Sequence, residues 1–284
     1  MLLLDRIIRP IARSCLPALA LAVALAAPAR AAELRIGSSA ALSGPAAALG
    51  LRYHAGAKAL FQQLNEQGGV AGARIMLDLR DDGYEPERAE ANTRELVEDA
   101  RVLALFGFVG TPTSRVALPY VRRGNIAFLG AFTGADILWE PGNAGVFNVR
   151  ASYREEARAL AQAMKAAGVR RYQTVFQADL FGRAGLEAMR AATDPLGLEM
   201  LGAATVKRNT TEVAASLAAL LQPGSKADAI FMVSTYETCA AFVRQARQQG
   251  FRGRFYTLSF AGLEPLREAL GGDLQELTMA QVVP

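Results

Sequence analysis

Residues 106–134 read FGFVGTPTSRVALPYVRRGNIAFLGAFTG and contain the ends of two apolar runs, 102–109 and 126–129. Each run stops at a small, hydroxyl-rich loop, 110–114 after the first and 130–134 after the second. A continuous apolar run bounded by turn residues is typical of a strand buried on both faces in a parallel sheet. Ligands of open α/β sheets bind just beyond the carboxyl ends of such strands. The two loops therefore predict a place where backbone N–H groups and hydroxyls hold a small polar or anionic group.

The N-terminal residues have the pattern of a secretory signal. Three arginines within residues 6–13 precede an apolar run over 16–27, and the small-x-small sequence Ala-Arg-Ala follows at 29–31. A basic region, an apolar region and a cleavage site in this order are typical of export signals. The apolar run is too short to span a bilayer comfortably. We therefore expect residues 1–31 to be a signal peptide cleaved near Ala31, and the mature protein to be periplasmic.

The charge of the chain does not favour a nucleic-acid partner. The formal net charge at pH 7 is +4, and residues 1–31 contribute four arginines against one aspartate, a net of +3. The mature chain is left with about +1, since 4 − 3 = 1. Most of the positive net charge thus belongs to the expected export signal, and we expect no nucleic-acid binding. Cys239 is the only cysteine after residue 31, so no internal disulfide is expected.

Strand and helix patterns alternate along the rest of the chain. Repeated β–α units joined by short turns predict parallel sheets flanked by helices. The strands are too many for one comfortable sheet, and 148–153 is the natural break between two lobes. We expect Pro119 to kink or end its helix. The predicted helices are 51–67, 86–98, 113–123, 154–167, 182–193, 212–221 and 237–249, and the predicted strands are 34–37, 75–80, 102–109, 126–129, 146–149, 174–176, 199–205, 229–233 and 255–258.

The reactive side chains give no support for an enzyme. His54 is the only histidine, and its place at the start of a predicted helix favours a solvated helix face. One histidine and one mature cysteine exclude a Cys/His metal cluster and a Cys/His nucleophile pair. No nucleophile elbow, phosphate-binding loop or dinucleotide fingerprint occurs, so we expect no cofactor. Asp81 and Asp82 would point to opposite faces of a strand, and we interpret them as a solvated turn or helix cap.

Six segments carry a specific resemblance to a known family. They are GSSAALSGPAAALG (37–50), GAKALFQQLNEQGGVAGARIML (56–77), ALFGFVGTPTS (104–114), FLGAFTGADIL (128–138), FNVRASYREE (147–156) and YETCAAFVRQARQQG (236–250). In this order they resemble the type I periplasmic substrate-binding proteins, and more closely the leucine/isoleucine/valine-binding branch that serves ABC importers. The resemblance covers essentially all of residues 33–284. It implies an α/β fold of two Rossmann-like lobes, 32–150 and 151–280, joined by crossover strands with the ligand trapped between them.

The resemblance also implies which residues touch the ligand. Thr111 takes the position of a serine that holds the ligand carboxylate, and Phe132 and Thr133 match a backbone and a hydroxyl contact. Phe181 matches a tyrosine of the second lobe that contacts the ligand. The full set implied as ligand-binding is Ser43, Leu49, Gly110, Thr111, Phe132, Thr133, Phe181, Thr235, Tyr236 and Ser259.

Two departures from the family pattern bear on the ligand. The acidic residue that binds the ammonium of an amino acid aligns near Ser259, so this countercharge is expected to be missing unless Asp179 or Glu237 supplies it. Phe132 and Phe181 make the predicted site more apolar. Both features favour a small carboxylate with an apolar or aromatic body, with an amino acid as the alternative.

The implied function is that of a monomeric solute-binding component of an ABC importer, which closes around a small solute and is presented to a membrane permease. The alternative is a ligand-binding sensor domain of a signalling receptor. An α/β enzyme would need a cofactor to supply its chemistry. The resemblance further implies that the C-terminal part of the family is missing, because residues 281–284 begin the crossover back to the first lobe. The chain is thus expected to be a truncated product or an incomplete piece.

Overall fold

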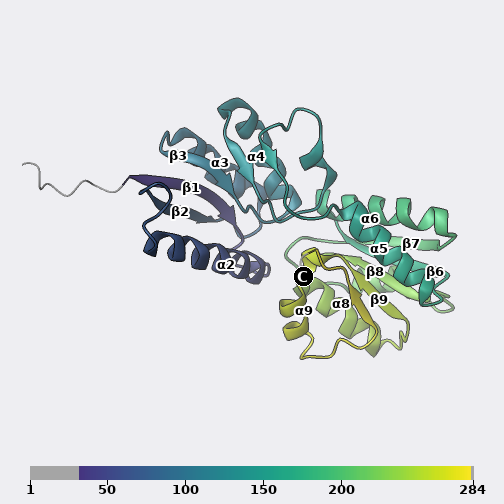
Figure 1. The fold of residues 1–284 in the computed structure, drawn as a ribbon. Helices are drawn as coiled ribbons and strands as arrows, with labels where there is room; N and C mark the ends of the chain where they lie inside the picture. The colour runs from purple at the N-terminus through teal and green to yellow at the C-terminus, as the bar shows by residue number, and fades with distance from the viewer. Residues whose placement is uncertain (1–31, 283–284) are drawn as a thin grey trace, which may run out of the picture.

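Two parallel five-stranded sheets organise the chain in the computed structural model, which describes residues 32–282 (Figure 1). With their helices they form an N-terminal lobe that ends at residue 147 and a C-terminal lobe that begins at residue 153, connected by the crossover segment 148–152. The expected signal peptide at 1–31 lies outside the described residues. The predicted fold class, two α/β lobes with parallel sheets flanked by helices, is confirmed.

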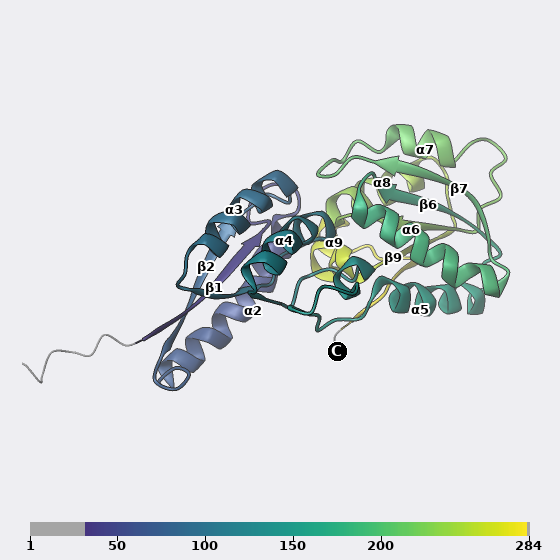
Figure 2. The same cartoon turned by 90° about the horizontal axis from the view of Figure 1, so that it is seen from above.

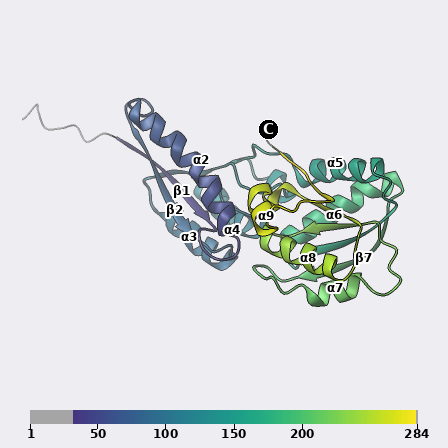
Figure 3. The ribbon, with the colours of Figure 1, turned by 90° about the horizontal axis from the view of Figure 1, so that it is seen from below.

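The N-terminal sheet has the strand order β2-β1-β3-β4-β5, and each of its pairings is parallel. Helix α2 covers one face of this sheet, and α3 and α4 lie on the other (Figure 1, Figure 3). The elements are β1 Glu33–Ala40, α2 Ala47–Glu66, β2 Arg74–Asp81, α3 Pro86–Glu98, β3 Val102–Phe106, α4 Thr111–Gly124, β4 Ala127–Leu129 and β5 Val146–Phe147.

The C-terminal sheet has the order β10-β9-β8-β6-β7 and is also parallel. Helices α5 and α6 lie on one face and α7 and α8 on the other (Figure 2). The central strand β8 is buried at each of its 5 residues, as expected for a strand covered on both faces. The elements are α5 Tyr153–Ala166, β6 Arg171–Gln177, α6 Leu180–Thr193, β7 Glu199–Val206, α7 Ala214–Leu220, β8 Ala229–Val233, α8 Tyr236–Gln248, β9 Arg254–Thr257, α9 Leu263–Ala269 and β10 Leu277–Met279.

Differences from the predicted elements have identifiable causes. Strand β3 ends at Phe106 because Gly107 adopts a φ of +66°, which turns the chain out of the sheet. Helix α4 continues through Pro119 to Gly124, so the proline does not end it. The buried face of α4 keeps the helix in place despite the hydrogen bond that a proline removes. Helix α9 and strand β10 are absent from the prediction.

Two adjacent serines of β1 serve opposite faces of the N-terminal sheet. The Ser38 hydroxyl lies 3.2 Å from Nε2 of His54, which is 1% exposed, so the expectation of a solvated His54 is wrong. The Ser39 hydroxyl donates to the buried Asp82 carboxylate at 2.7 Å, so the solvated interpretation is wrong for Asp82 as well. Burial lowers the pKa of His54 to about 4 and raises the pKa of Asp82 to about 6. For both side chains, folding therefore favours the neutral form over the charged form.

Asp82→Asn should leave the pH dependence of stability that His54 contributes unopposed. The folded-state pKa of Asp82 is raised, so the free energy of unfolding falls as pH rises from about 4 to about 6, by about 1.4 kcal/mol per pH unit. The depressed pKa of His54 acts oppositely, because stability is lost as pH falls from about 6.5 towards 4. The two effects should largely offset each other in the wild type. Urea unfolding of Asp82→Asn should show stability rising across this window, and a profile parallel to that of the wild type would contradict the assignment.

Candidate ligand-binding site

Loops at the carboxyl ends of both sheets meet between the lobes. The rings of Tyr84, which follows β2, and Phe260, which follows β9, have centroids 5.9 Å apart. The backbone N–H of Ala48 donates to the Tyr236 hydroxyl of the C-terminal lobe at 3.3 Å. Because parallel sheets place ligands at these strand ends, the region between the lobes is the candidate site.

Three buried hydroxyl groups form a cluster at the start of α4. The Oγ1 atoms of Thr111 and Thr133 are 2.7 Å apart, and Thr133 donates to the Tyr153 hydroxyl at 3.1 Å. The two threonines follow β3 and β4, and the pairing of these strands brings them together. Burial raises the pKa of Tyr153 to about 12, so its hydroxyl keeps its proton. This hydroxyl cluster is therefore a neutral set of donors and acceptors.

Aromatic rings from both lobes fill the space beside the hydroxyl cluster. The centroid of the Phe260 ring lies 4.5 Å from that of Phe181 and 5.5 Å from that of Phe132. Phe181 also packs against Tyr153 at 5.5 Å. Phe181 and Phe260 are fully buried, whereas Phe132 is half-buried. The structure thus brings the predicted residues Phe132 and Phe181 together through Phe260, which the sequence reasoning missed although it follows Ser259 directly.

A buried guanidinium lies on the crossover segment. The Arg150 side chain is 6% exposed, and its Cζ lies 4.7 Å from the centroid of the Phe132 ring. Its Nη2 donates to the Ser259 hydroxyl and to the Glu156 carboxylate, the latter at 3.3 Å. The Ser259 N–H donates to the same carboxylate at 2.7 Å. A carboxylate therefore does lie beside Ser259, contrary to the expectation, but it is already paired with Arg150.

The sequence gives one signal that singles out Arg150. It is a charged residue inside the segment predicted to connect the lobes. A segment that connects two lobes has to run beside any site that lies between them. Tyr153 begins the helix after the same segment. A search of the crossover for polar side chains would have found both.

The other predicted residues differ in their burial around the hydroxyl cluster. Ser43 is exposed, while Leu49 and Thr235 are buried, and the Thr235 hydroxyl has no hydrogen-bond partner among residues 32–282. Gly110 adopts a φ of +105°, and a Cβ there would lie 2.1 Å from the Tyr84 ring. Only glycine fits between this ring and the start of α4.

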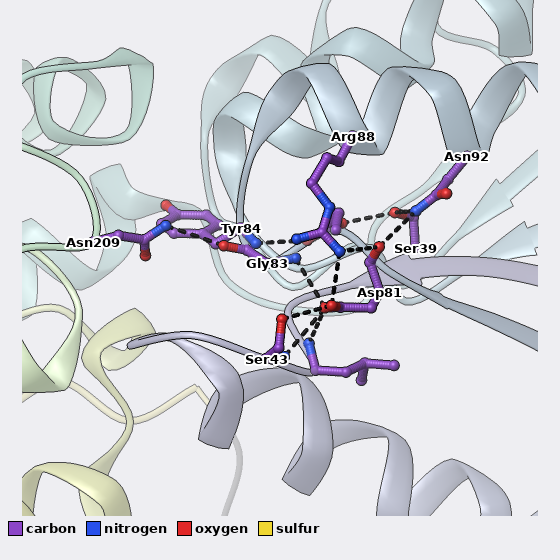
Figure 4. Close-up of polar contacts among 10 residues, drawn as sticks. Ser39, Ser43, Asp81, Gly83, Tyr84, Arg88, Asn92 and Asn209 are labelled. Atoms are coloured by element: carbon purple, nitrogen blue, oxygen red, sulfur yellow. Dashed lines mark hydrogen bonds and ion pairs between the residues drawn. The ribbon is translucent and has the colours of Figure 1, made fainter.

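The turn after β2 is organised by one partly exposed carboxylate (Figure 4). Asp81 accepts from the Ser43 hydroxyl at 2.6 Å and from the Gly83 N–H at 2.9 Å, and it pairs with Arg88 at 2.8 Å. The predicted site residue Ser43 is thereby fixed to the turn. Its hydroxyl serves the turn in this structure.

A polar seam joins this turn to the C-terminal lobe. The side-chain amide of Asn209 donates to the Gly83 carbonyl at 3.0 Å (Figure 4) and to Glu85 at 2.7 Å. Arg208 pairs with Glu85 at 2.7 Å and with Asp179 at 3.3 Å. Arg208 and Asn209 thus connect the C-terminal lobe to the N-terminal lobe, and these contacts form only when the lobes are close together.

A groove of about 680 Å³ reaches the hydroxyl cluster from outside. One wall comes from the 3-10 turn Asp136–Trp139 of the N-terminal lobe, and the other comes from α6. Thr111 and Tyr153 line it, together with charged side chains that include Asp136 and Arg183. The groove gives a solute a route to the cluster along the interface of the lobes.

Other site types find no support in the part of the chain that the structure describes. Within residues 32–282, no group of three or more His, Cys, Asp and Glu side chains could hold a metal ion. Nor does any helix in that range have the length and apolarity to cross a membrane.

The chain belongs to the periplasmic binding protein family, whose model matches residues 33–283. The crystal structure of a possible leucine/isoleucine/valine-binding protein from Rhodopirellula baltica is 36% identical with a TM-score of 0.84, and the match covers 91% of this chain and 71% of that one. A substrate-binding periplasmic protein from Ralstonia solanacearum is 29% identical with a TM-score of 0.81, and covers 88% and 71% of the two chains. An amino acid binding protein of Pseudomonas aeruginosa is 25% identical over 85% of this chain and 64% of its own length.

These matches confirm the resemblance to the leucine/isoleucine/valine-binding branch. The family and these relatives are substrate-binding proteins and not enzymes, as the sequence indicates. The chain spans 64% to 71% of the length of the three relatives.

If Thr111 holds the carboxylate of a solute, as the resemblance implies, Thr111→Ala should weaken binding of a keto acid such as 4-methyl-2-oxopentanoate by about 1–3 kcal/mol, because a hydrogen bond to a charged oxygen is lost. Thr113→Ala is the matched control, since its hydroxyl donates to the Val109 carbonyl within the first turn of α4. The control should lower the melting temperature and leave affinity unchanged. Calorimetry that finds equal affinities for Thr111→Ala and the wild type would remove Thr111 from the site.

Proposed function

We propose that the protein is the periplasmic solute-binding component of an ABC importer, capturing an amino acid or a small aliphatic or aromatic carboxylate between its lobes. One observation carries the proposal. A hydroxyl cluster, apolar rings and a buried guanidinium converge between two lobes, and both lobes contribute groups. The amino acid binding protein of Pseudomonas aeruginosa supports a solute of this size.

The proposal has a cellular part as well. Residues 1–31 direct export and are removed, residues 32–150 and 151–280 are the two lobes, and the mature protein is a monomer. Its partner is a membrane permease that accepts the closed form. The export pattern in the sequence and the family membership support this part.

Solute capture would work through closure of the lobes. A ligand that contacts both lobes binds the closed form better than the open form, and so it shifts the population toward closure. The polar seam also favours the closed form, because its contacts between the lobes are made only there. The affinity for solute therefore includes the free energy of forming the seam.

A thermal-shift screen tests the proposed function. The panel is leucine, 4-methyl-2-oxopentanoate, phenylacetate, phenylacetamide and succinate, each added to the purified full chain. A true ligand at 100 times its dissociation constant should stabilise the protein by about 2.7 kcal/mol. Small-angle scattering with the best ligand should show a smaller radius of gyration. Stabilisation by none of the five compounds would count against the proposal.

Arg208→Ala should weaken binding of every ligand in the panel by a similar factor, about two- to fivefold. A partly exposed ion pair contributes about 0.5–1 kcal/mol, and here it is formed only in the closed state. Arg190→Ala, which removes an exposed arginine of α6, is the control and should have no effect. If Arg208→Ala changed the affinity for one ligand alone, Arg208 would be a ligand contact rather than part of the seam.

A further inference from the structure

Arg150 is the buried group whose hydrogen-bonding capacity is least used. A guanidinium has five N–H donors, and the two on Nη2 serve Ser259 and Glu156. The Nε and Nη1 atoms are buried and have no partner among residues 32–282. Each unpartnered buried donor costs about 1–3 kcal/mol. A fold that keeps three such N–H groups between its lobes has the donors for an anion that arrives from outside.

The neighbours of Arg150 match the two ends of a small carboxylic acid. Its guanidinium stacks over the Phe132 ring, which also contacts Phe260. Its positive charge opposes the rise that burial causes in the pKa of Tyr153, whose hydroxyl belongs to the hydroxyl cluster. A carboxylate beside Arg150 would thus have hydroxyl donors near it and aromatic faces for the body of the molecule.

The carboxylates of Glu156 and Asp179 are already engaged by groups of the protein. Both oxygens of Glu156 are used, one by Arg150 and the other by the Ser259 N–H. Asp179 accepts from the N–H groups of Phe181 and Gly182 and pairs with Arg208. The free capacity at the centre of the site is therefore that of a donor, and an unpaired buried ammonium costs several kcal/mol.

We infer that Arg150 binds the carboxylate of the solute, and that the solute is a small carboxylic acid with an apolar or aromatic body and no ammonium group. This inference rests on the proposed function and names the chemical class of its ligand. It also makes Arg150 the residue that gives acids a higher affinity than their neutral analogues. Thr111 and Thr133 then supply neutral hydroxyl donors to the same carboxylate.

The test compares Arg150→Gln with the wild type, using two matched pairs of probes in calorimetry. The pairs are phenylacetate with phenylacetamide and 4-methyl-2-oxopentanoate with leucine. The wild type should bind each acid at least about tenfold more tightly than its partner. Arg150→Gln should lose about 10- to 100-fold in affinity for the acids and less than about threefold for the amide, since a hydrogen bond to a charged group is lost. Arg158→Gln, an exposed arginine of α5, is the control and should match the wild type.

A second variant distinguishes a loss of binding from a failure of Arg150→Gln to fold. Arg150→Gln leaves the Glu156 carboxylate buried without its partner, so the double variant Arg150→Gln/Glu156→Gln removes both charges. It should fold and show the same loss of preference for acids. An equal fall for acid and amide would overturn the inference. Tighter binding of leucine than of its keto acid would overturn it and keep the proposed function, while no binding of any probe to the wild type would overturn both.

Discussion

Burying the guanidinium of Arg150 requires groups from both lobes, and the centre of the molecule is arranged around this requirement. The N-terminal lobe supplies the Phe132 ring, and the C-terminal lobe supplies Glu156 and the Ser259 hydroxyl. A charge removed from water has to be paired and hydrogen-bonded. The crossover is therefore more than a connection between lobes, because its one arginine contacts Phe132 of the N-terminal lobe and Glu156 and Ser259 of the C-terminal lobe.

Two kinds of contact hold the lobes together, and they respond differently to a solute. The aromatic contacts around Phe260 are apolar and would be replaced by ligand contacts when a solute enters. The polar seam of Arg208 and Asn209 lies at the turn after β2 and uses none of the residues of the hydroxyl cluster.

The sequence predicts the parts of the site that depend on local pattern. Thr111 and Thr133 follow apolar runs directly, and the rule that ligands bind at strand ends is enough to bring them together. Arg150 and Phe260 were missed because each has a partner more than 100 residues away, Ser259 for Arg150 and Phe132 for Phe260, and no local periodicity reports such contacts. The solvated interpretation of His54 failed for a similar reason, since its partner Ser38 lies on a different element.

The 3-10 turn that walls the groove also holds Trp139, the only tryptophan of the chain, whose side chain is 44% exposed. Its indole sits on the N-terminal lobe, in the turn that faces α6 of the other lobe across the groove. Its chain neighbours Ile137 and Glu140 line the groove opposite α6. A single exposed tryptophan in this turn is a natural choice of intrinsic fluorescence probe for lobe motion, with no label attached.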